Sequence, residues 1–81
     1  MTPTGRQIRE GRTLAGMSQG DLAAGANVAI GLLVRVEASD GLPMITRRDS
    51  IAITAALEGA GVEFISGNRN TASVQMRRRE P

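Results

Sequence analysis

The fold is decided by residues 18–37, SQGDLAAGANVAIGLLVRVE. Ser18 is a favourable N-cap residue, and the helix dipole favours Asp21 in the first turn, so we expect a helix over residues 19–25. Asn27 is the residue other than glycine that best tolerates a positive φ. The stretch therefore predicts a helix, a tight turn and a second helix.

The helix after the turn is expected over residues 29–38. Leu33 and Val36 recur at helical spacing and are expected to point inward, with Leu32 or Ile30 close to them.

A capping box marks the start of the first helix. In this motif the hydroxyl of Thr4 accepts a hydrogen bond from the backbone, and the side chain of Gln7 reaches back to the cap residue. The motif predicts a helix over residues 5–15. Gly16 then stands where a helix ends in the left-handed conformation.

The remaining elements follow residue 40. Residues 44–47 are expected to form a short helix or turn, and Asp49 to cap a final helix whose apolar face is Ile53, Ala56, Leu57 and Ala60. Residues 62–65 and 73–77 alternate with period two around the turn-rich segment 66–71, which predicts a β-hairpin.

The expected fold class is therefore mainly α: a bundle of four or five helices with a short C-terminal hairpin. We divide the chain into a helical domain over residues 4–60, a strand pair over 61–78 and a disordered tail over 79–81.

Composition excludes many classes of protein. The 81 residues include no cysteine, histidine, tryptophan or tyrosine, which excludes zinc fingers, thiol nucleophiles and histidine-based catalysis. Phe64 is the only aromatic residue, too few for a base-stacking surface. A chain of this length is unsuited to a deep catalytic cleft. We expect no enzyme activity, cofactor or metal.

All ten basic residues are arginines, and they face eight acidic residues, for a net charge of +2. Residues 1–40 carry four arginines and four acids, whereas residues 41–81 carry six arginines and four acids. The excess positive charge therefore lies in the second half.

No segment suggests a membrane protein. The longest apolar run, residues 28–34, is far shorter than a membrane span, and residues 1–4 lack a signal-peptide pattern. We expect a cytoplasmic, nucleoid-associated protein.

Residues along the first three helices carry a recognisable pattern: Ile8, Arg12, Ala15-Gly16-Met17-Ser18-Gln19, Leu22-Ala23, Ala26-Asn27-Val28, Leu33 and Val36-Glu37. This pattern resembles the XRE, or lambda-repressor/Cro-like, helix-turn-helix family of DNA-binding proteins. The tail, residues 56–65 and 73–77, is similar to a subgroup of small bacterial regulators with a C-terminal strand pair. The resemblance covers residues 5–78.

The resemblance implies that the second and third helices bind double-stranded DNA. Ser18 and Gln19 would meet a phosphate at the N-terminus of the second helix. The third helix would enter the major groove with Ala29, Ile30, Gly31 and Arg35 toward the bases, flanked by Leu32 and Val34. Arg47 and Arg48 follow a loop that approaches the DNA in this family, and we expect either phosphate contacts or a solvated pair. Arg12 and Glu37 match the family's partly buried ion pair.

The third helix departs from the family pattern. Ala29 replaces the usual Ser or Thr cap, at a cost of roughly 1 kcal/mol. Ile30 and Leu32 cannot form bidentate hydrogen bonds with base edges, although they can pack on thymine methyl groups or serve as ordinary core or interface residues. Arg35 is the one residue able to contact guanine in this way, the alternative being a solvated or phosphate-bound arginine. Relaxed specificity is expected.

We expect a homodimeric transcriptional regulator, acting as a repressor. A lone hairpin is marginally stable in water, so the expected interface lies on the strands: Val62, Phe64, Ile65, Val74 and Met76. Residues 77–79 are expected to be disordered or to form a DNA-binding arm. The alternative function is a protein-interaction module, or an antitoxin-like protein, on a helix-turn-helix scaffold with reduced base contact.

Overall fold

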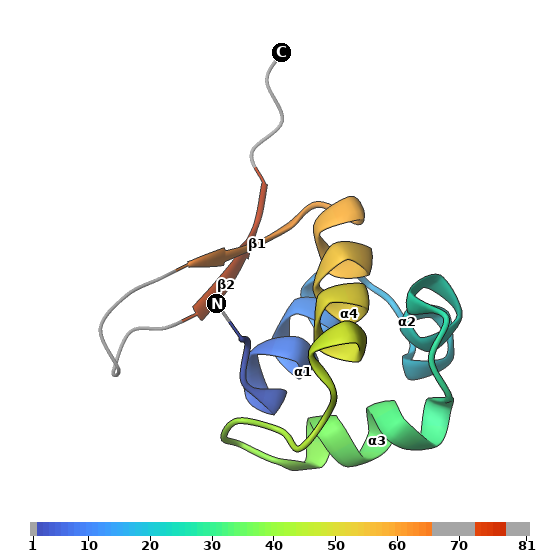
Figure 1. Cartoon of the computed structure of the whole chain (residues 1–81). Helices are drawn as coiled ribbons and strands as arrows, with labels where there is room; N and C mark the ends of the chain where they lie inside the picture. Colours follow the sequence, from blue (N-terminus) through green and yellow to red (C-terminus); the bar gives the residue numbers. More distant parts are fainter. Residues whose placement is uncertain (1, 66–72, 78–81) are drawn as a thin grey trace.

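The computed structural model describes residues 2–65 and 73–77. In these residues four helices precede an antiparallel strand pair: α1 (Gly5–Leu14), α2 (Gln19–Ala26), α3 (Ile30–Ala38), α4 (Arg47–Gly59), β1 (Val62–Ile65) and β2 (Ser73–Met76) (Figure 1). The expectation of a mainly α protein with a C-terminal hairpin is confirmed. The predicted turn at residues 66–71 and the tail at 78–81 lie outside the described residues.

Local signals set the starts of α1 and α2. Thr4 and Ser18 each form a capping box, as the side chain of each accepts from the backbone three residues on. Asn27 ends α2 with φ of 57°, the left-handed conformation expected of it. The tight turn predicted at residues 26–28 therefore joins α2 to α3, and the structure places it one residue later, at 27–29.

The start of α4 differs from the prediction. Thr46 is the N-cap, and its hydroxyl accepts from the backbone N–H of Asp49 at 3.1 Å. Asp49 therefore lies in the first turn, where the dipole also favours an acid. Residues 42–46 form no helix, so the described residues contain four helices rather than five.

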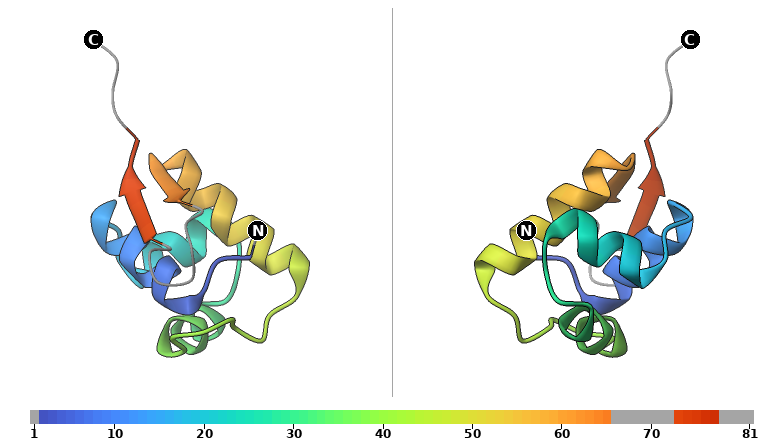
Figure 2. Two further views of the ribbon diagram at one scale, coloured as in Figure 1. Left: turned by 90° about the vertical axis from the view of Figure 1, so that its left-hand side faces the viewer. Right: turned by 90° about the vertical axis from the view of Figure 1, so that its right-hand side faces the viewer.

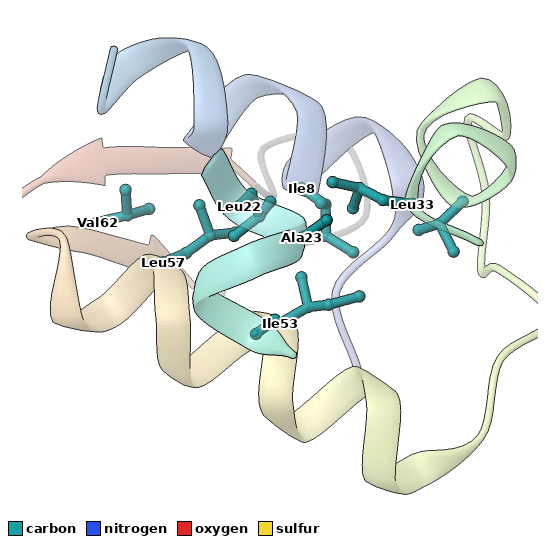
Figure 3. Close-up of a cluster of buried hydrophobic side chains, with 9 residues drawn as sticks. Ile8, Leu22, Ala23, Leu33, Ile53, Leu57 and Val62 are labelled. Carbon is teal, nitrogen blue, oxygen red and sulfur yellow. The ribbon is translucent and has the colours of Figure 1, made fainter. Parts of the chain in front are cut away.

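One apolar core joins the helices to the strands. Its fully buried large side chains come from α1, α2, α3, α4 and β1: Ile8, Leu22, Leu33, Ile53, Leu57 and Val62 (Figure 3). The strand pair is therefore packed on the same core as the helical segment.

The predicted dimer interface is wrong at Val62. It is 0% exposed within a single chain, so it cannot contact a partner. The reason lies on α1, where Gly11 leaves room for it: a Cβ at Gly11 would lie 3.1 Å from Cγ1 of Val62. Phe64 and Val74 form a cross-strand pair and also pack against this core. Ile65 is half-buried and Met76 is exposed.

The start of α1 is held against the end of α3. The backbone N–H of Gly5 donates to the carbonyl of Gly41 at 2.9 Å. A Cβ at Gly5 would overlap the carbonyl oxygens of Val36 and Ser39. Only glycine fits this close approach, which fixes the position of α3.

The arrangement leaves α3 at one end of the molecule. It runs below the other helices, on the side away from the C-terminal end of β2 (Figures 1 and 2). Among the helices that the structure describes, none has the length and apolar character needed to span a bilayer.

Candidate nucleic-acid interface

One side of α3 is not covered by the rest of the described chain. Leu33, Val36 and Glu37 are buried, whereas five residues at helical spacing are exposed: Ile30, Gly31, Val34, Arg35 and Ala38. We call these five residues the outer face of α3. Ile30 is 53% exposed and Val34 45% exposed, so the face is largely aliphatic.

The structure changes one of the predicted positions on α3. Leu32, predicted beside the bases, is half-buried and packs against the core, which also decides the alternative between Leu32 and Ile30 as the inner residue. Val34 is exposed, which agrees with the flanking position predicted for it. The spacing contained this signal, because Val34 is one helical turn after Ile30, and residues four apart share a face.

The first turn of α3 lacks a side-chain cap. Ala29 is the N-cap and makes no side-chain hydrogen bond, as its residue type requires. Ala29 is exposed, so the start of α3 is open to solvent.

A network around Glu37 holds α3 against α1. Nε of Arg12 donates to Oε2 of Glu37 at 2.8 Å and Nη2 donates to Oε1 at 2.9 Å. The side chains are 18% and 3% exposed, so the pair implied by the family resemblance is present and largely buried. Nη1 of Arg12 also donates to the carbonyl of Met17 at 2.9 Å, which ties in the segment before α2.

The side chains of Gln19 and Ser18 already have hydrogen-bond partners within the chain. Nε2 of Gln19 donates to Oε1 of Glu37 at 3.3 Å, which the sequence did not reveal. The hydroxyl of Ser18 accepts from the N–H of Asp21, and the Asp21 carboxylate accepts from the N–H of Ser18 at 3.1 Å. These hydrogen bonds, first the one from the backbone of Ser18, lower the pKa of Asp21. A negative charge therefore stands where a phosphate was expected.

The six arginines of the helices fall into two groups. The three on α1 each meet a carboxylate: Arg6 with Glu10 at 3.5 Å, Arg9 with Asp40 at 3.3 Å and Arg12 with Glu37 at 2.8 Å. Arg35, Arg47 and Arg48 are exposed, and within residues 2–65 and 73–77 none of them forms an ion pair.

A shallow depression connects Arg35 to the start of α4. A hollow of about 160 Å³ beside Arg35 and one of about 400 Å³ beside Thr46 and Asp49 share two lining residues, Leu32 and Met44. The end of α3 and the first turn of α4 therefore border one continuous surface.

In the part of the chain that the structure describes, no group of three or more acidic side chains is arranged to hold a metal ion. Exposed guanidinium groups without a carboxylate partner, such as Arg35 on α3 and Arg47 and Arg48 on α4, can contact phosphates or base edges.

Comparisons with known proteins assign no relative to the chain: no family model matches it, and neither does any curated protein or solved structure.

Proposed function

We propose that this chain binds double-stranded DNA through α2 and α3, as a helix-turn-helix, and acts as a transcriptional repressor at the nucleoid. The observation that carries the proposal is the division of the arginines. Those on α1 are neutralised by carboxylates, whereas Arg35 on the outer face of α3 and Arg47 and Arg48 in the first turn of α4 form no ion pair among the described residues.

The shape of α3 supports a groove contact. The major groove of B-DNA, about 12 Å wide, admits an α-helix. With the outer face of α3 toward the bases, Arg47 and Arg48 would reach phosphates from the first turn of α4. Both roles need only side chains that are already exposed.

We propose further that the protein acts as a homodimer. The two-stranded sheet leaves one edge of each strand unpaired within the described residues, and such edges favour pairing with another chain. Ile65 and Met76 would line this interface, because Val62 belongs to the core of the single chain. Sedimentation at micromolar concentration tests this, and a folded monomer would exclude it.

A salt titration tests DNA binding. Fluorescence anisotropy of a labelled random-sequence duplex pool would follow affinity at increasing salt. The two phosphate contacts of Arg47 and Arg48 give a logarithmic slope of about −1.8 per chain, which weakens binding roughly 12-fold between 50 and 200 mM salt. Arg48→Ala should reduce the slope by about 0.9, whereas Arg6→Ala, on the paired α1 group, should not change it. Absence of binding at low salt would refute the proposal.

A second candidate is a protein-interaction or antitoxin-like module, and one observation favours it. Of the seven large apolar side chains that are exposed in the described residues, four lie on α3 or in the loop after it: Ile30, Val34, Leu42 and Met44. If the chain fails to bind any duplex at low salt, this surface becomes a docking site for a protein partner instead.

A further inference from the structure

The outer face of α3 contains one side chain that is able to form hydrogen bonds. Arg35 carries a guanidinium group, whereas Ile30, Val34 and Ala38 are aliphatic and Gly31 has no side chain. A helix with this face in the major groove must contact most base edges through apolar atoms.

Only one feature of those edges suits an apolar side chain. In the major groove, guanine, adenine and cytosine present donors and acceptors alone, whereas thymine also presents its C5-methyl group. An isoleucine placed over a polar edge displaces water without replacing the hydrogen bonds, which is unfavourable. Over thymine it buries a methyl group instead.

We infer that α3 selects DNA by packing Ile30 and Val34 against thymine C5-methyl groups, an inference that rests on the proposed function. The two residues are one turn apart, about 6 Å along the helix, which corresponds to roughly two base-pair steps.

The small residues of the outer face allow the backbone of α3 to approach the base edges closely. A Cβ added at Gly31 would have no atom of the protein within 4 Å, so this part of α3 is open toward a ligand. With glycine and alanine between the aliphatic side chains and Arg35, the helix can lie deep in the groove. Arg35 then contacts a neighbouring guanine or phosphate.

Deoxyuridine provides the test, because it differs from thymidine only by the missing methyl group. The probes are a 30-base-pair duplex of alternating dA and dT and the same duplex with deoxyuridine in place of dT, compared by anisotropy at low salt. Each buried methyl group is expected to contribute about fourfold in affinity, the equivalent of about 0.8 kcal/mol. Two contacts per chain predict binding to the deoxyuridine duplex that is about 15-fold weaker for a single bound chain and about 250-fold weaker for a homodimer with both copies of α3 engaged. Replacing cytosine by 5-methylcytosine in an alternating dG and dC duplex should strengthen binding.

A matched pair of variants assigns the effect to α3. Ile30→Ala should remove about fourfold of the preference for thymine over uracil. Ile51→Ala, which truncates a similarly exposed isoleucine on α4 (57% against 53%), should leave the preference unchanged.

The outcomes separate the inference from the proposed function. Salt-dependent binding with equal affinity for the two duplexes would overturn the methyl contacts and leave DNA binding intact. An equal effect of the two isoleucine variants would also overturn them. No binding to any duplex would overturn both proposals.

Discussion

The Arg12–Glu37 pair allows a quantitative test of how α3 is held in place. Replacing Arg12 by alanine leaves the carboxylate of Glu37, 3% exposed, with the amide of Gln19 at 3.3 Å as its remaining side-chain donor. The carbonyl of Met17 also loses its donor. A buried charge that loses its partner costs about 3–5 kcal/mol. A domain of this size has a total stability of roughly 4–12 kcal/mol, so Arg12→Ala should be close to unfolding.

Neutralising the other partner, Glu37, should lower the free energy of unfolding by less. Glu37→Gln leaves Arg12 charged, but this side chain is 18% exposed and keeps its bond to the carbonyl of Met17. Water can then solvate part of the guanidinium group. We expect a loss of about 1–3 kcal/mol, as for other hydrogen bonds to charged groups.

The double variant isolates the pair. With Arg12→Leu and Glu37→Leu together, no charge is left buried, so the loss should fall to about 1–2 kcal/mol. Urea denaturation followed by far-ultraviolet circular dichroism is the appropriate assay, because the chain has no tryptophan or tyrosine.

Two results would refute this reasoning. One is a loss below about 1 kcal/mol for Arg12→Ala, which would mean that water solvates Glu37 freely. The other is a double variant as unstable as the sum of the single leucine variants, which would mean that the two side chains act independently. If Arg12→Ala does not fold, recovery of folding in the double variant still tests the coupling.

Three further perturbations follow from the structure. Gly5→Ala should destabilise the protein by about 1–3 kcal/mol, because the added methyl group overlaps backbone carbonyls. Gly31→Ala, whose methyl group meets open space on a helix, should stabilise the protein by about 0.5–1 kcal/mol. Equal thermal midpoints for the two variants would contradict this. The lowered pKa of Asp21 means that its stabilisation is present above pH 3.8 and is lost as the pH falls through the lower folded value, so thermal midpoints of the wild type and Asp21→Asn should converge in acid. Gln19→Ala should reduce stability by about 1 kcal/mol with unchanged affinity for DNA, and an equal loss of affinity on every duplex sequence would assign this side chain to a phosphate instead.

Elements governed by local signals were predictable. The caps at Thr4 and Ser18 and the left-handed Asn27 depend on neighbours within a few residues, and the structure places all three as expected. The start of α4 was placed wrongly because Thr46 and Asp49 are both favourable at a helix start, three residues apart. Propensity alone does not rank them.

Features that depend on contacts distant in the sequence were not predictable from the residues. The apolar–polar alternation around Val62 fits a strand that packs on the core as well as one that forms an interface. Only the space beside Gly11 decides between these two positions. The same holds for the amide of Gln19, whose partner lies 18 residues away on α3. The Arg12–Glu37 pair came from family resemblance rather than from spacing.

The charge around α3 differs from what the summed charge of residues 1–40 suggests. Residues 1–40 are neutral in sum, which suggests a poor polyanion-binding surface. In the structure, the two acids at the end of α3, Glu37 and Asp40, are occupied by arginines of α1. Arg35 therefore faces solvent without a nearby ion-pair partner among the described residues, on the same end of the molecule as the first turn of α4. The ion pairs that fix α3 in position also neutralise the carboxylates next to it, which would otherwise repel phosphates. One set of contacts would therefore serve both stability and DNA binding.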